Sequence, residues 1–330
     1  MKKTITRILT LLLAVLMLAP ALAACGKPDA ELEMKIYVLS GTTALGMAQL
    51  MDEVKNETAE MNYQISIKSS ADEITGPIMN GECAIAALPT NAAAKLYKAS
   101  EGKVQLLALN TLGVLYLLQS GDTTVNSLQD LKGKTVYLPG EGTNPEIIMK
   151  ALLQSANLTV GTDVFLNSTA YPSPDDLTTA VASGKADLAV LPEPKVSVVT
   201  SKNTSVKVAL NLTSEWEAIN GKDTLVQGCL VVNAAFAKEH PAEIKKFLED
   251  YSDSVQFIKE GSDEALNMIV DAKLLPSTGV AKKALPNCNL CCITGEDMKA
   301  PMKTFCEKLF AAVPASVGAI PDDAFYYVAK

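Results

Sequence analysis

The sequence has 330 residues, of which 48% are hydrophobic and 20% are charged, and its formal net charge is −8. This composition is typical of a globular protein, and the negative charge argues against a nucleic-acid-binding protein, which needs a basic face. Aromatic residues make up only 5% of the chain, so few side chains are available to stack on bases. The single histidine, His240, argues against a histidine-rich metal site and against a Ser-His-Asp triad. We therefore expect no metal, no other cofactor and no nucleic-acid partner.

The N-terminus has the pattern of an export signal. Basic residues precede an apolar run over 8–18, which is too short for a permanent membrane-spanning helix of roughly 20 residues. The motif Leu-Ala-Ala-Cys that ends at Cys25 resembles the bacterial lipobox, in which the cysteine is lipidated. An ordinary cleavage site beside an unrelated cysteine is the alternative. We predict a lipoprotein signal peptide over 1–24, a lipidated Cys25 with a tether to 33, and a chain anchored by that lipid at the extracytoplasmic face of the bacterial cell membrane.

Six further cysteines follow Cys25. Two of them, Cys83 and Cys229, lie in apolar, strand-like runs and are predicted to be buried. The other four cluster near the C-terminus, where no histidine is close and the second half of a zinc motif is missing, so a metal site is disfavoured. Structural thiols and a disulfide both stay open, because the pairing of cysteines cannot be deduced from their spacing. This cluster consists of Cys288, Cys291, Cys292 and Cys306.

From Met34 onward, short strand-like runs alternate with amphipathic, helix-like runs. This alternation is typical of βαβ units and a mostly parallel sheet. We predict a first group of strands over 34–39, 63–68, 84–88, 104–109 and 114–119, with helices over 44–54, 74–80 and 92–100.

A second α/β run follows a polar turn over 121–126. We predict strands over 135–138, 163–166, 188–191 and 206–210, with helices over 145–156 and 174–183. An apolar strand over 228–232 and a strongly amphipathic helix over 241–259 come next, and the remainder is expected to be mostly helical.

Four stretches carry a resemblance to a known family. They are S-L-Q-D-L-K-G-K over 127–134, a helix–strand segment over 180–190 followed by Glu193-Pro194, a strand followed by A-F-x-x-x-x-P over 229–246, and C-terminal helices over 287–303 and 321–327. In this order the stretches resemble the type II periplasmic substrate-binding proteins of ABC importers, in particular the nitrate/sulfonate/taurine and thiamine-precursor branch.

The resemblance implies an α/β fold of two lobes with mixed or parallel sheets and a ligand cleft between them. The expected boundaries are 34–121 for the first part of lobe one, 122–226 for lobe two, and 227–330 for the return to lobe one with the C-terminal helices. It also implies a monomer that captures a small polar molecule, sulfonate-, nitrate- or thiamine-precursor-like, by lobe closure and delivers it to an ABC permease. A surface sensor is one alternative. An enzyme is a weaker one, since His240 precedes a helix-starting proline and resembles a cap.

Four loops are candidates for the ligand site, because ligands of open α/β sheets lie beyond the carboxyl ends of the strands. They span 40–43, 88–91, 140–144 and 192–194. The first three lead into predicted helix N-termini, whose free N–H groups and positive dipole favour an anion. The predicted ligand-binding residues are Ser40, Gly41, Thr42, Thr43, Pro89, Thr90, Asn91, Gly142, Thr143, Asn144, Glu193 and Trp216.

Acidic residues in these loops point to a different kind of ligand. Glu193 lies between two prolines directly after an apolar strand, and Glu141 is a weaker candidate of the same kind. Such an acidic pair favours a cationic or amine-bearing solute and opposes a bare anion, in conflict with the helix N-termini, and the sequence leaves both ligand types open. Trp216, the only tryptophan, either lines the cleft or covers a hydrophobic edge.

Overall fold

The structure is a computed structural model that describes residues 27–121 and 123–329. The predicted signal peptide and the predicted lipidation site at Cys25 lie outside the described residues. Within the described part of the chain, no helix combines the length and the apolar character needed to cross a membrane.

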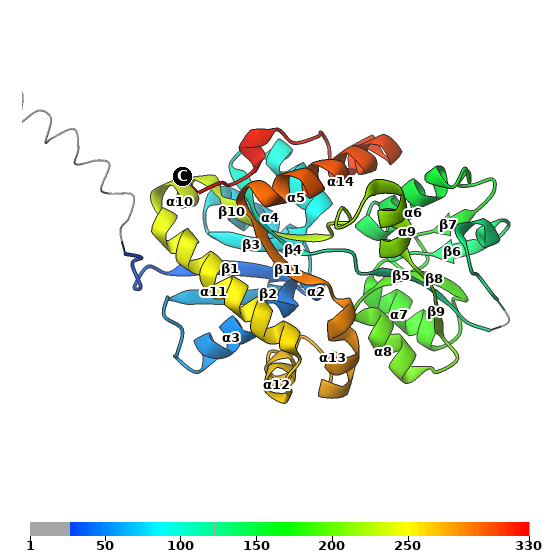
Figure 1. Cartoon of the computed structure of the whole chain (residues 1–330), viewed down its shortest axis with the longest axis horizontal. Coiled ribbons are helices and arrows are strands. Elements are labelled where there is room, and N and C mark those ends of the chain that lie inside the picture. The colour runs from blue at the N-terminus through cyan, green and yellow to red at the C-terminus, as the bar shows by residue number, and fades with distance from the viewer. Residues whose placement is uncertain (1–26, 122, 330) are drawn as a thin grey trace, which may run out of the picture.

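The first lobe is built on a six-stranded mixed sheet, at the left of Figure 1. Its strands lie in the order β11-β4-β10-β3-β1-β2, in which β1 pairs in parallel with β2 and β3, whereas β10 runs antiparallel to β3 and β4. The strands are β1 (Met34–Leu39), β2 (Tyr63–Lys68), β3 (Ile85–Pro89), β4 (Val104–Thr111), β10 (Gly228–Asn233) and β11 (Leu290–Thr294).

The second lobe, at the right of Figure 1, is built on a five-stranded mixed sheet in the order β7-β6-β8-β5-β9. Here β6 is parallel to β7 and β8, and β5 is antiparallel to β8 and β9. The strands are β5 (Leu115–Gln119), β6 (Thr135–Tyr137), β7 (Phe165–Asn167), β8 (Leu188–Pro192) and β9 (Lys207–Asn211). Two mixed sheets in two lobes confirm the predicted fold class.

Helices cover both sheets, and short 3-10 turns connect several of them. Those of the first lobe are α2 (Thr42–Leu45), α3 (Ala48–Lys55), α4 (Asp72–Asn80), α5 (Thr90–Ala99), α10 (Ala234–Glu239), α11 (Pro241–Glu260), α12 (Asp263–Asp271), α13 (Thr278–Ala284) and α14 (Lys299–Ala312). Those of the second lobe are α6 (Asn144–Ser155), α7 (Pro174–Ala182), α8 (Lys195–Lys202) and α9 (Leu212–Asn220).

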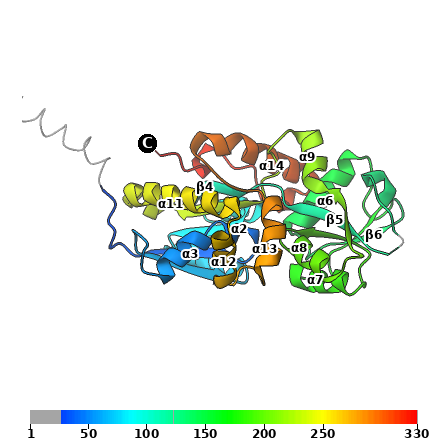
Figure 2. The same ribbon diagram turned by 60° about the horizontal axis from the view of Figure 1, so that its bottom comes forward.

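One hydrophobic core continues from the first lobe into the second. Strands β4 and β5 both contribute leucines to it, and α14 packs against α6 across the top of the molecule (Figure 2). Phe305 on α14 packs against Trp216 on α9, with 5.7 Å between the ring centroids. The opposite face of the first sheet has its own core, in which Met34, Ile36 and Val38 lie beside residues of α11 and α12. The side of the molecule where α14 lies is therefore closed by apolar packing.

The chain passes between the lobes through two short segments, which we call the crossing segments. Residues 112–114 lead from β4 to β5, and residues 221–227 lead from α9 back to β10. The predicted boundary after residue 121 is thus wrong for β5, which pairs in the second sheet. The polar turn that suggested the boundary comes after this strand, whereas the true crossing carries no polar signal because Val114 and Leu115 are buried.

A strand, β11, interrupts the C-terminal region that was expected to be mostly helical. It pairs with the edge of β4 and contains Cys291 and Cys292, which are half-buried. All six cysteines in the described part of the chain are free, and Cys83 and Cys229 are fully buried, as predicted. No group of three or more potential metal ligands occurs among the described residues. Structural thiols are therefore the alternative that the structure supports.

Candidate functional site

A cavity of about 480 Å³ lies between the two lobes. We call it the interlobe cavity. Its walls are the loops that follow β1, β3, β6, β7 and β8, together with both crossing segments. These loops meet because parallel strands present their carboxyl ends at the same edge of a sheet. The predicted residues that line it are Ser40, Gly41, Thr42, Thr43, Pro89, Asn91, Gly142, Thr143, Asn144 and Glu193.

Two predicted residues do not line this cavity. Thr90 is fully buried, and its hydroxyl donates a hydrogen bond to the carbonyl oxygen of Val226 at 2.6 Å. Trp216 is also fully buried beneath α14, and its indole N–H donates to the hydroxyl of Thr224 at 3.1 Å. The prediction that Trp216 lines the cleft is therefore wrong, because a helix from much later in the chain covers it. The weaker candidate Glu141 is exposed and lies outside the cavity lining.

The sequence analysis missed five polar residues that line the cavity, and three of them, Lys95, Lys195 and Gln227, matter most for binding. Lys95 projects from α5, four residues after Asn91, and Lys195 begins α8. The sequence contains a signal for each of these two lysines. Lys95 shares a helix face with Asn91, because residues four apart lie on one face of a helix, and Lys195 comes two positions after Glu193. The third, Gln227, lies on a crossing segment, where no regular pattern indicates which way a side chain points.

The carboxylate of Glu193 is almost completely buried, at 2% exposure. Its two oxygens accept hydrogen bonds from the backbone N–H of Ser197 at 3.0 Å and from the Ser197 hydroxyl at 2.9 Å, so it caps the first turn of α8. Burial raises the pKa of this carboxyl to about 7, although the two hydrogen bonds from Ser197 act in the opposite direction. Glu193 therefore changes charge near neutral pH, inside the interlobe cavity.

Gln227 ties the two crossing segments together at the cavity. Its side-chain Oε1 accepts a hydrogen bond from the backbone N–H of Val114 at 2.7 Å, and its own backbone N–H donates to Thr111 at 2.9 Å. Its carbonyl oxygen accepts from the backbone N–H of Thr90 at 3.3 Å and from Asn144 Nδ2 at 3.5 Å. This one residue is thus bonded to the first lobe, to the second lobe and to the other crossing segment.

Direct hydrogen bonds also join the two lobes around the cavity. The hydroxyl of Thr42 donates to the carbonyl oxygen of Glu193 at 2.6 Å. At the surface, Lys283 on α13 donates to the hydroxyl of Thr200 on α8 at 2.7 Å. Because both bonds need the lobes close together, the structure corresponds to a closed arrangement of the two lobes.

Groups that favour an anion lie in one part of the interlobe cavity. Helix α5 of the first lobe and helix α6 of the second both begin at the cavity, and neither N-cap residue makes a side-chain capping bond. Lys95 is exposed and makes no ion pair within the described part of the chain, whereas Lys195 pairs with Asp175. Helix N-termini and an ammonium group both stabilise an anion. The cavity can therefore hold a small acidic group between the lobes.

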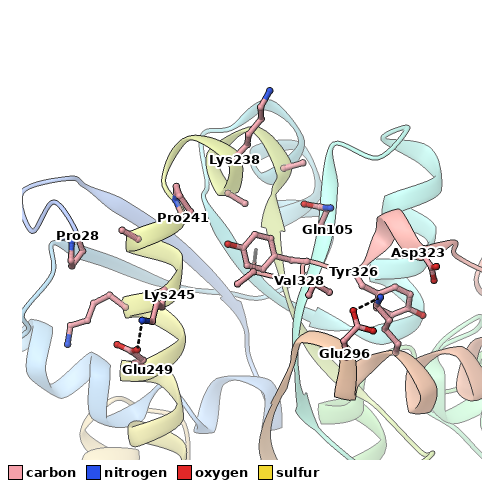
Figure 3. Close-up of a pocket in the computed structure, with 17 residues that line it drawn as sticks. Pro28, Gln105, Lys238, Pro241, Lys245, Glu249, Glu296, Asp323, Tyr326 and Val328 are labelled. Carbon is pink, nitrogen blue, oxygen red and sulfur yellow. Dashed lines mark hydrogen bonds and ion pairs between the residues drawn. The ribbon is translucent and has the colours of Figure 1, made fainter. Parts of the chain in front are cut away.

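A second cavity, of about 820 Å³, lies beside the N-terminal end of α11 and the C-terminal residues (Figure 3). Three of the four lysines that line it are already paired: Lys245 with Glu249, Lys299 with Glu296, and Lys246 with Glu60 and Asp250. These pairs leave few polar groups free to orient a ligand, so the smaller interlobe cavity is the better candidate site.

Comparison with known proteins adds two sequence matches. Residues 103–265 match the family model described as NMT1/THI5 like. A protein of Bacillus subtilis (strain 168), described as a candidate aliphatic sulfonates-binding protein, is 31% identical over 100 residues, which cover 30% of this chain and 28% of that protein. The matched stretch is thus well under two thirds of the relative's length.

Solved structures resemble the chain over most of its length. A crystal structure of an ABC transporter protein from Parabacteroides distasonis has a TM-score of 0.76 at 22% identity, covering 92% of this chain and all of that one. The periplasmic aliphatic sulphonate binding protein of Escherichia coli has a TM-score of 0.72 at 14% identity, covering 90% and 92%. The periplasmic nitrate-binding protein of Synechocystis PCC 6803 has a TM-score of 0.59 at 12% identity, covering 80% and 70%. These likenesses confirm the type II periplasmic binding protein fold.

Proposed function

We propose, from the match of residues 103–265 to the NMT1/THI5-like family model and from the type II periplasmic binding protein fold, that this chain is the substrate-binding component of an ABC importer. Its solute would be a small anionic solute of the sulfonate or nitrate type. The observation that carries the proposal is the interlobe cavity, at which helices from both lobes begin beside Lys95. The named relatives that bind sulfonates or nitrate support the same ligand class.

Capture would follow from contacts that one ligand makes with both lobes. The first lobe offers the loop over 40–43 and Asn91, and the second offers Thr143, Asn144 and Glu193. A ligand that touches both sets binds the closed form better than the open form and therefore shifts the population toward closure. The proposal includes no catalytic step, and His240 lies between α10 and α11, outside the cavity lining.

Delivery requires the protein to stay near a membrane permease. The lipobox-like motif at Cys25 supports a lipid anchor, which would hold the chain at the extracytoplasmic surface without a spanning helix. We include the anchor and the permease partner in the proposal. Labelling of the expressed protein with a fatty-acid probe, compared between the natural chain and Cys25→Ser, tests the anchor directly, because only the natural chain would carry the label.

The ligand class is tested by thermal unfolding of the purified chain with alkanesulfonates, aminoalkanesulfonates and nitrate. At a ligand concentration of 100 times Kd, a true ligand stabilises the fold by about 2.7 kcal/mol. Replacing Lys95 with methionine removes a charge-assisted hydrogen bond worth about 1.5–3 kcal/mol, which weakens affinity about 10- to 100-fold. Lys98→Met is the matched control, since Lys98 is exposed on the same helix outside the cavity lining. Equal affinity of the Lys95→Met variant and the natural chain would contradict the assignment of the cavity.

A further inference from the structure

Glu193 lies at a direct contact between the two lobes. Helix α13 of the first lobe packs against α8 of the second, and the two helices lie side by side in Figures 1 and 2. Glu193 comes two residues before α8, and its carbonyl oxygen accepts the hydrogen bond from Thr42 of the first lobe. Its side chain therefore stands where the lobes must separate when they open.

Both lobes supply groups that surround the Glu193 carboxyl. In the first lobe, burial and the nearby Glu193 raise the pKa of the Cys288 thiol. In the second lobe, burial and Glu193 raise the pKa of Tyr116 on β5 to about 12. Helix α2 and strand β8 carry no titratable side chain. The charged or titratable groups around the carboxyl are Lys283, Cys288, Tyr116, Lys95, Lys195 and Asp175, the last of which pairs with Lys195.

The Glu193 carboxyl is buried without a cation bonded to it. It is 2% exposed, and among the described residues its oxygens bond only to Ser197, at 3.0 Å and 2.9 Å. A buried carboxylate without a paired cation is costly, so burial favours the protonated acid. The Ser197 hydroxyl suits either form, because a hydroxyl donates to a carboxylate and accepts from a protonated acid. The closed lobes can therefore hold the neutral acid without leaving a buried group unpaired.

Opening the lobes removes part of this burial. Thr42, Lys283 and Cys288 belong to the first lobe and move away, whereas Ser197 stays with Glu193 in the second lobe. Water then reaches the carboxyl, whose pKa returns toward its ordinary value of 4.5. In the closed form, burial raises this pKa to about 7. The closed form therefore binds more protons than the open form between these two pH values.

We propose that the contact between α13 and α8 is a proton-coupled latch, in which the Glu193 carboxyl takes up a proton from water as the lobes close over it and releases that proton as they open. Acid pH then favours closure, and a pH above neutral favours opening. The inference goes beyond the proposed function, because it concerns the movement of the lobes and does not depend on which solute the cavity takes.

The experiment is single-molecule fluorescence energy transfer on the full chain without solute, at pH 8 and at pH 6. Non-natural residues at two exposed positions, Lys55 on α3 and Lys185 in the second lobe, carry the fluorophores. The two pKa values predict that the ratio of closed to open molecules rises about tenfold from pH 8 to pH 6. In Glu193→Gln, whose amide resembles the neutral acid, the ratio should be the same at both pH values. Glu141→Gln, an exposed acid outside the cavity lining, should keep the tenfold change.

Ser197→Ala separates the titration of Glu193 from a structural effect of replacing it. The variant removes the hydroxyl that bonds to the carboxylate and keeps the bond from the backbone N–H. Because the ionised form loses a donor, the change in the ratio should move to higher pH. A ratio that is the same at pH 8 and pH 6 in the natural chain, including a chain that stays in one state, overturns the inference. So does a pH dependence that Glu193→Gln retains, or one that Ser197→Ala leaves at the same pH.

The latch and the proposed function fail separately. The energy-transfer experiment contains no solute, so it does not test the ligand class. If the ratio changes as expected and no alkanesulfonate binds, the sulfonate ligand class is overturned and the latch stands. If alkanesulfonates bind and the ratio does not change with pH, the latch is overturned and the proposed function stands.

Discussion

Replacing Gln227 with methionine removes one hydrogen bond beside the cavity and keeps the length of the side chain. In the natural chain, Gln227 Oε1 accepts from the backbone N–H of Val114 at 2.7 Å, and the two residues are 8% and 3% exposed. Methionine offers no acceptor of comparable strength, and the buried Val114 N–H would lose its partner. Leaving a buried donor unsatisfied costs about 1–3 kcal/mol. We therefore expect Gln227→Met to lower the free energy of unfolding by that amount.

Urea unfolding measures this loss, with the fluorescence of the single tryptophan as the probe. Trp216 is fully buried in the core that joins both lobes, so its emission reports unfolding of that core. Gln64→Met is the matched control, because Gln64 is exposed on β2 and bonds only to the side chain of Asn62. Such surface changes are usually within about 0.5 kcal/mol. If Gln227→Met unfolds with the same free energy as Gln64→Met, the bond to Val114 does not hold the crossing segments together.

Three further substitutions or measurements test other parts of the structure. Gly228→Ala would bring the new Cβ within 2.5 Å of Asn110 Oδ1, so it should lower the free energy of unfolding in urea by about 1–3 kcal/mol. Gly76→Ala is the control: its Cβ meets nothing within 4 Å inside α4, so it should be neutral or stabilising. Equal effects of the two substitutions would refute the close packing at Gly228. Trp216 should emit at short wavelength and resist quenching by iodide with or without ligand, and strong quenching would place it in the cleft after all. Because the pKa of Glu193 is raised to about 7, the folded state binds more protons than the unfolded state between about pH 4.5 and 7. The free energy of unfolding should therefore fall by on the order of 1–3 kcal/mol as pH rises through this window. Glu193→Gln should remove this slope, and a slope that the variant leaves unchanged would refute this account.

Strands and helices with a clear hydrophobic pattern in their own residues were predicted close to their observed limits. The strand Met34–Leu39 was predicted with its observed limits from its apolar run, and in the structure its side chains alternate between buried and half-buried. The long helix Pro241–Glu260 was predicted to within one residue, because its proline start and its apolar stripe both follow from the helical repeat. Four of the five loops that line the cavity were predicted for a similar reason: each one follows an apolar strand, and the topology brings such ends together. The loop after β7, which contributes residues 172–174, was not predicted.

Features that depend on distant partners could not be predicted. Trp216 is covered by Phe305, and nothing near the tryptophan in the sequence indicates that α14 will lie there. The strand Leu115–Gln119 is as apolar as β4, so its transfer to the second sheet left no trace in the composition. Gln227 sits in a segment without secondary structure, where the direction of a side chain is decided by the hydrogen bonds that it finds. These bonds come from residues 83 or more positions earlier in the chain.

The hydrogen bonds along the cavity connect the proposed ligand groups to the segments that any lobe movement must bend. The Thr42 hydroxyl donates to the Glu193 carbonyl, and the Glu193 N–H donates to Val114 at 2.9 Å. The Val114 N–H then donates to Gln227, whose carbonyl lies against Asn144. Opening the lobes must break the first of these bonds, whereas the bond between Val114 and Gln227 can persist because both residues lie on the crossing segments. A ligand that contacts both lobes beside Glu193 would therefore favour the closed form, in which Thr42 bonds to Glu193. The bond between the crossing segments would stay the same in both forms, so we expect affinity to depend on lobe closure and the stability of the fold not to.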